Sequence, residues 1–163
     1  MRTALSGALL FTVACAMNPS PVPVSGAMSD VKALAGEWTG EYWSVETGRS
    51  GSILFTLDAG RDTAFGDVVM VAREKGMTHD DAVRVASRRQ AANQVLTIRF
   101  VRVTGTTVSG TIDPYPSPDC ECQLTTVFSG ELRGDRIEGR FRTSHSAHPG
   151  VVQEGTWRAT RGK

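Results

Sequence analysis

The chain has 163 residues, of which 40% are apolar, and this suits one domain with a single hydrophobic core. Its 18 basic and 17 acidic residues leave a net charge of +1, so the protein has no electrostatic reason to bind nucleic acid. The composition is also unlike that of a disordered chain, a collagen or a repeat array.

Residues 1–14 predict an export signal. Arg2 precedes an apolar stretch of the length found in secretory signals, which is too short for a bilayer span of about 20 residues. The next residue is Cys15, preceded by Thr12-Val13-Ala14. This resembles a bacterial lipobox, with Thr12 where lipoboxes usually carry Leu, and implies cleavage before Cys15 and its lipidation. An ordinary signal peptide, cut after Ala16 or near Ala27, is the alternative.

The resemblance also implies where the protein resides. The residue after the cysteine is Ala16 rather than Asp, which in lipoproteins of this type implies sorting to the outer membrane of a cell that has one. We therefore expect an exported, lipid-anchored protein of the cell envelope. Prolines alternate with other residues in segment 15–33, which favours extended polyproline II and blocks helix. We interpret 15–33 as a tether and 34–163 as the folded domain.

From Gly36 onward the chain has the pattern of an all-β domain. Short runs of alternating apolar and polar residues are separated by Gly, Asp and Ser, as in sandwiches and barrels. The strands are predicted at 37–44, 52–58, 65–73, 95–103, 107–113, 122–132, 137–145 and 153–160. A closed barrel of about eight strands is just wide enough to be filled by side chains or to hold one small ligand. We predict an eight-stranded antiparallel up-and-down meander barrel.

Two hairpins define the register of its second half. A two-residue Gly134-Asp135 turn is a strong hairpin signal and places Phe128 opposite Phe141 and Leu124 opposite His145. In the preceding hairpin, a three-residue turn at 104–106 places one apolar row inside and a second row outside. The predicted inner row is Leu96, Ile98 and Phe100, and the outer row is Val101 and Val103.

Between the third and fourth strands the sequence favours a short surface helix over 79–91. Thr78 followed by Asp81 fits a helix N-cap with an acidic third residue. An extra strand through Val83 and Val85 is the alternative. This segment also concentrates basic residues, which form either a solvated face or a contact with anionic lipid headgroups: Arg73, Lys75, Arg84, Arg88 and Arg89.

Two short motifs resemble the calycins, the group of lipocalins and avidins. The domain opens with Gly36-Glu37-Trp38 and ends with Gly155-Thr156-Trp157-Arg158-Ala159-Thr160-Arg161. The resemblance implies that Trp38 plugs one end of a barrel and that Arg158 or Arg161 stacks on it, a cation–π contact of about 0.5–2 kcal/mol. The loop and tryptophan pattern of avidins cannot be traced, so the resemblance does not extend to biotin.

The sequence Cys120-Glu121-Cys122 is the remaining chemical motif. In an oxidising compartment we expect a disulfide or a pair of thiols. The hairpin register brings this motif beside His145 and His148, so a Cys₂His₂ metal site is the alternative.

No hydrolase, metalloprotease or P-loop motif is found in the sequence, so we predict a protein that is not an enzyme and needs no cofactor. Its expected partners are the bilayer, reached through Cys15, and a small apolar ligand. The predicted cavity lining is Leu96, Ile98, Phe100, Leu124, Phe128 and Phe141. The alternative is a structural or protein-interaction module of the envelope with a filled barrel.

Overall fold

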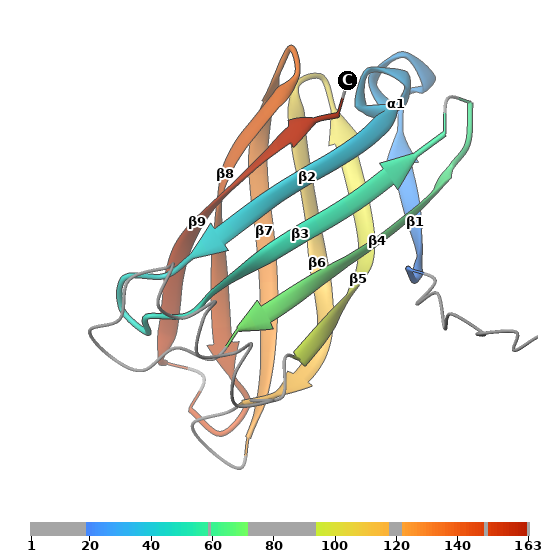
Figure 1. Cartoon of the computed structure of the whole chain (residues 1–163). Coiled ribbons are helices and arrows are strands. Elements are labelled where there is room, and N and C mark those ends of the chain that lie inside the picture. The colour runs from blue at the N-terminus through green and yellow to red at the C-terminus, as the bar shows by residue number, and fades with distance from the viewer. Residues whose placement is uncertain (1–18, 59, 72–93, 118–121, 149, 163) are drawn as a thin grey trace, which may run out of the picture.

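Nine strands close into a barrel in the computed structural model, which describes residues 19–58, 60–71, 94–117, 122–148 and 150–162 (Figure 1). The strands are β1 Pro21–Gly26, β2 Gly36–Trp43, β3 Ser50–Leu57, β4 Thr63–Val71, β5 Gln94–Thr104, β6 Thr107–Pro116, β7 Gln123–Arg133, β8 Arg136–His145 and β9 Val152–Arg161. The described part of the chain has one helix, α1 Met28–Leu34, and no helix there is long and apolar enough to cross a membrane.

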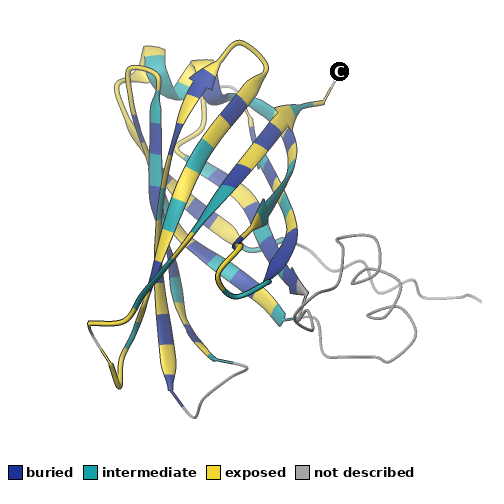
Figure 2. Ribbon diagram, turned by 90° about the vertical axis from the view of Figure 1, so that its left-hand side faces the viewer, coloured by how far each residue is buried: buried dark blue, intermediate teal, exposed yellow. Residues whose placement is uncertain are grey.

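The strands from β2 to β9 form the predicted meander. Each pairs antiparallel with the next, and β9 pairs with β2 to close the barrel. All eight predicted strands are therefore present, with ends that differ by a few residues. Buried and more exposed residues alternate along most of these strands, as the coloured bands show (Figure 2). An all-β closed barrel was correctly predicted.

The prediction of eight strands, all antiparallel, is wrong because β1 is a ninth. It pairs antiparallel with β4 and parallel with β5, and it therefore lies between them at one end of the barrel. The sequence suggested a tether here because Pro21 and Pro23 favour extended backbone. However, the residues between and after them, Val22 and Val24, are only 0% and 6% exposed. The alternation of outward proline and inward valine makes this extended segment part of the barrel.

The β7–β8 hairpin has the predicted register: Phe128 lies opposite Phe141, and Leu124 lies opposite His145. The β5–β6 hairpin differs from its prediction. Its turn has two residues rather than three, so Val103 pairs with Val108, and a β-bulge follows Ile98. The extra residue of a bulge reverses which side chains point inward.

The inner row of β5 is therefore different from the predicted one. Val101 and Val103 are buried in the core, whereas Phe100 is not part of it. The predicted helix at 79–91 and the basic cluster at 73–89 lie outside the described residues, and so do residues 1–18 with Cys15.

Candidate functional site

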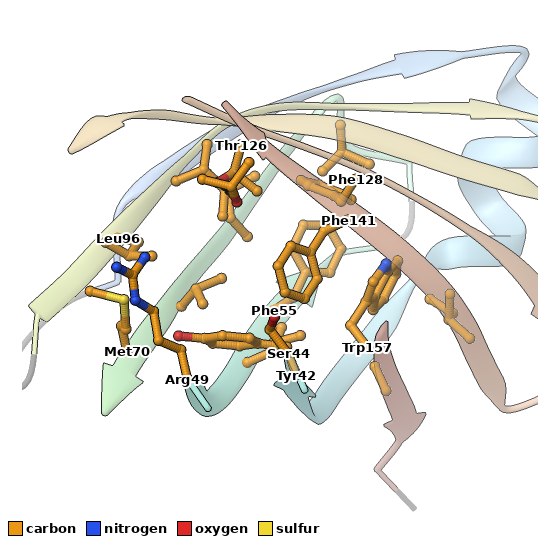
Figure 3. A pocket seen from close by; sticks show the side chains of 18 of the residues that line it. Tyr42, Ser44, Arg49, Phe55, Met70, Leu96, Thr126, Phe128, Phe141 and Trp157 are labelled. Atoms are coloured by element: carbon orange, nitrogen blue, oxygen red, sulfur yellow. Dashed lines mark hydrogen bonds between the residues drawn. The ribbon is translucent and has the colours of Figure 1, made fainter. Parts of the chain in front are cut away.

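The barrel encloses a cavity of about 100 Å³. It extends from Leu34 and Trp38, at the end covered by α1, to the β2–β3 loop at the other end, where Ser44, Thr47 and Arg49 border it. Most of the side chains between these ends are apolar (Figure 3). The cavity lies in the barrel interior, where the sequence predicts a bound ligand.

Four of the six predicted lining residues face this cavity, namely Leu96, Ile98, Phe128 and Phe141. Phe100 does not, because of the β5 bulge. Leu124 is fully buried but is not among the residues that line the cavity.

Sequence reasoning missed a second set of lining residues, which come from β2, β3, β4 and β9: Tyr42, Phe55, Val68, Met70 and Trp157. The inward parity of β2 could have identified Tyr42, since Trp38 and Tyr42 are four residues apart on one strand and therefore share a face.

Five of the aromatic rings that line the cavity each lie opposite a glycine on the neighbouring strand. These cross-strand pairs are Tyr42–Gly51, Phe55–Gly66, Phe128–Gly110, Phe141–Gly155 and Trp157–Gly139. A Cβ added at Gly51, Gly110, Gly139 or Gly155 would come within 3.0 Å of the ring opposite. The missing side chains therefore let the rings lie flat across the adjacent strand.

This arrangement explains why an interior with so many aromatic rings is not completely filled. Rings lying against the wall leave space at the centre of the barrel. They also pack edge to face, with centroid distances of 5.6 Å for Tyr42–Phe141 and 5.8 Å for Phe128–Trp157, a favourable geometry for aromatic pairs. The indole Nε1 of Trp157 donates to the Ser129 carbonyl at 3.1 Å, which fixes this ring in the wall.

A few polar groups border the otherwise apolar space. The hydroxyls of Tyr115, Thr126 and Thr143 form a chain, with O–O distances of 3.0 and 2.8 Å. On the other side of the cavity are Tyr42 and Arg49 (Figure 3). Burial raises the pKa of the Tyr42 phenol well above its ordinary value, Tyr115 raises this pKa further, and Arg49 lowers it by a smaller amount. The phenol is therefore a neutral hydrogen-bond donor at physiological pH.

Arg49 is 7% exposed, and it is the one formally charged side chain among the described residues that line the cavity. Its Nη1 donates to Gln153 Oε1 at 3.5 Å, and its backbone nitrogen donates to Thr47 Oγ1 at 3.2 Å. These contacts order the loop that borders the cavity.

The end of the barrel beneath α1 is closed by Trp38. This ring is 1% exposed, and its Nε1 donates to the Leu34 carbonyl at 2.8 Å. The guanidinium carbon of Arg161 lies 4.5 Å from its centroid. Arg161 also donates to the carbonyls of Ala33 and Ala35, so it joins α1, β2 and β9.

Of the two candidates for stacking on Trp38, Arg161 is therefore the one that does so. Arg158 lies instead 5.6 Å from the centroid of Trp43 and pairs with Glu41 on the outside of the barrel.

Of the Cys120-Glu121-Cys122 motif, the described residues include Cys122. Cys122 is disulfide-bonded, and its Sγ lies 3.6 Å from His145 Nδ1. Because Cys120 is outside the described residues, its pairing with Cys122 stays a prediction. His148 is exposed. The described residues contain no group of three side chains able to hold a metal, and a disulfide sulfur does not offer the thiolate that zinc binds.

Comparisons of this chain with protein-family models, with curated proteins and with solved structures find no match.

Proposed function

We propose that the protein is a calycin-like lipoprotein of the cell envelope that binds a small apolar ligand inside its barrel. The apolar cavity of about 100 Å³ is the observation that supports this most directly. An apolar protein cavity of about 150 Å³ takes up benzene, so the present, smaller space of about 100 Å³ suits a molecule no larger than benzene. Barrel interiors with few polar groups are common small-molecule sites.

The contacts at the closed end support the calycin part of the proposal. The resemblance implies that a basic residue near the chain end stacks on a tryptophan of the first meander strand, and Arg161 lies over Trp38 in this way. Such a plug closes one end, so that ligand would enter at the other end, beside Arg49 and the β2–β3 loop.

Lipidation at Cys15 would place the barrel close to a membrane. Only residues 16–20 separate Cys15 from the start of β1 at Pro21, and an extended residue spans at most about 3.6 Å. Changing Cys15 to Ser should therefore move the protein from the membrane fraction to unprocessed or soluble material. Unchanged lipid labelling of that variant would contradict the anchor.

A structural or protein-interaction module is the second candidate. The cavity is smaller than the roughly 300–1,000 Å³ of sites for drug-sized ligands, and a small barrel can be stable with its interior filled by side chains. In this case the barrel would carry no ligand, and its outer surface would be the functional part.

Native mass spectrometry of protein purified from its own membranes separates the two candidates. Ligand binding predicts a small molecule that stays bound in the native spectrum and is lost on denaturation. Val68→Phe, which fills the cavity from β4, should abolish the extra mass. Leu54→Phe is the matched control, because Leu54 is exposed on the outside of β3. A native mass equal to that of the protein alone would favour the filled module.

A further inference from the structure

Three hydroxyls on adjacent strands form a buried polar chain in the wall of the cavity. Tyr115 on β6, Thr126 on β7 and Thr143 on β8 are 8%, 3% and 3% exposed, and all three border the cavity. Thr126 Oγ1 lies 3.0 Å from the Tyr115 oxygen and 2.8 Å from Thr143 Oγ1. No other hydrogen bond of these side chains is found among the described residues.

Counting the hydrogens of this chain shows that one is left without an acceptor. Three hydroxyls supply three hydrogens, and two hydrogen bonds use two of them. Which hydroxyl keeps the third hydrogen depends on which oxygen donates in each of the two hydrogen bonds. Every arrangement leaves one hydrogen unused, on Tyr115, Thr126 or Thr143. A buried donor without a partner is unfavourable, so this wall offers a hydrogen bond to whatever occupies the cavity.

A second donor borders the same space. The Tyr42 hydroxyl is buried and has no hydrogen-bond partner among the described residues, and its ring lines the cavity. The described lining residues include no carboxylate that could accept from either donor. The polar groups of this cavity are therefore matched to an acceptor rather than to a cation.

We infer that the ligand carries an accepting oxygen, such as a carbonyl or ether, which takes the unused hydrogen of the Tyr115–Thr126–Thr143 chain. This inference rests on the proposed function and specifies its ligand class. A pure hydrocarbon of the same shape leaves the buried hydrogen without a partner, so the hydroxyl chain discriminates between the two ligands.

The test compares two probes of equal shape, cyclopentanone and methylenecyclopentane, which differ in C=O against C=CH₂. Each is titrated into the purified protein while the backbone amide signals are followed by NMR. The variant with Tyr115→Phe, Thr126→Val and Thr143→Val removes all three hydroxyls together. No buried hydroxyl is then left without its hydrogen-bond partner. The control is Thr125→Val, on the same strand as Thr126 but exposed on the outside.

The expected result is a change in the ratio of the two Kd values. The preference for the ketone, relative to the alkene, should fall about tenfold in the triple variant and stay unchanged in the control. Thr143→Val alone leaves two hydroxyls and one hydrogen bond, and so still one unused hydrogen. It should therefore keep the preference of the wild type, which also provides a test if the triple variant does not fold.

The remaining outcomes overturn the inference in distinguishable ways. If both probes bind and their Kd ratio is the same in the wild type and the triple variant, the proposed function survives but the hydroxyl chain does not select the ligand. A water molecule permanently bound to the chain would give this result. Loss of the preference in Thr143→Val contradicts the inference that the hydroxyl chain as a whole, rather than Thr143 alone, supplies the hydrogen. If neither probe binds to the wild type, both the inference and the proposed function fail.

Discussion

Trp38 and Arg161 show how two residues far apart in sequence close one end of the barrel. The indole uses its single donor on the Leu34 carbonyl, and the guanidinium covers the ring while bonding to carbonyls at the end of α1. Gly36 permits this approach, because a Cβ there would lie 3.3 Å from the Arg161 side chain and its φ is +127°. The Gly-x-Trp motif is thus explained by the arginine that packs against it.

Arg161→Leu should therefore destabilise the protein far more than Arg158→Leu. Arg161 combines a cation–π contact with hydrogen bonds and an ion pair to Asp135 at 3.0 Å, and its loss should cost about 2–4 kcal/mol. Arg158 is mostly exposed, and a surface ion pair contributes about 1 kcal/mol or less. Urea unfolding measures both losses, and equal losses would contradict the assignment of Arg161 as the residue that holds Trp38 in place.

Tyr42 makes stability depend on pH in the alkaline range. Burial raises the pKa of its phenol in the folded state, whereas in the unfolded chain the value is about 10. Below that pH both states keep the proton and the stabilisation is complete. As the pH rises from about 10 toward the folded-state pKa, the unfolded state loses the proton first and stability falls, by at most about 1.4 kcal/mol per pH unit.

Urea unfolding between pH 8 and pH 11 tests this pH dependence. Tyr42→Phe keeps the ring but has no phenol to titrate, so its stability should fall less steeply above pH 10 than that of the wild type. Identical slopes would show that the Tyr42 phenol is not buried in the folded state.

At the scale of strands, the pairs of aromatic residue and glycine determine the shape of the interior. Gly155→Ala should destabilise the barrel by about 1–3 kcal/mol, because the new Cβ would overlap the Phe141 ring and push it toward the cavity. Gly150→Ala is the control, since no atom lies within 4 Å of a Cβ at that position. Thermal unfolding of the two variants provides the comparison, and equal small shifts would contradict the role of glycine in the wall.

Strand β1 provides a prediction that distinguishes a barrel strand from a tether. Val22 is fully buried, so Val22→Ala should cost about 2 kcal/mol through lost burial and a residual cavity. Ser25→Ala in the same strand is exposed and should change stability by less than about 0.5 kcal/mol. Indistinguishable unfolding curves for these two variants would mean that β1 does not pack on the barrel in solution.

The meander was predictable because its strands alternate regularly and its turns have strong local signals. The Gly134-Asp135 turn alone determined the whole register from Leu124 to His145. The bulge after Ile98 was not predictable, since it depends on how β5 pairs with β6 and gives no local signal. Similarly, Pro21 and Pro23 indicated extended backbone correctly, but whether an extended segment is solvated or paired depends on the strands beside it.

The same distinction applies to the candidate site. Phe128 and Phe141 were identified from one hairpin. The hydroxyl chain of Tyr115, Thr126 and Thr143 was not, because it joins three strands and needs the irregular register of β6, which shifts between Ile112 and Tyr115. Local sequence patterns locate the apolar wall, whereas contacts across several strands locate the polar groups.

For the molecule as a whole, the two ends of the barrel have different roles. One end is closed by α1, Trp38 and Arg161, and strand β1 lies between β4 and β5 at this end. The cavity continues from there to the β2–β3 loop with Arg49. The described residues thus form a barrel with one closed end beneath α1, an apolar interior whose rings lie against glycines, and polar residues where the cavity meets the β2–β3 loop.

The central claim is that this interior contains an accessible apolar cavity, and a crystal structure of the protein under xenon pressure tests it most directly. Xenon occupies apolar protein cavities of this kind. The account predicts a xenon atom bordered by Phe128 and Phe141 in the wild type and its absence in Val68→Phe. A barrel that takes up no xenon, with side chains filling the space between these rings, would contradict it.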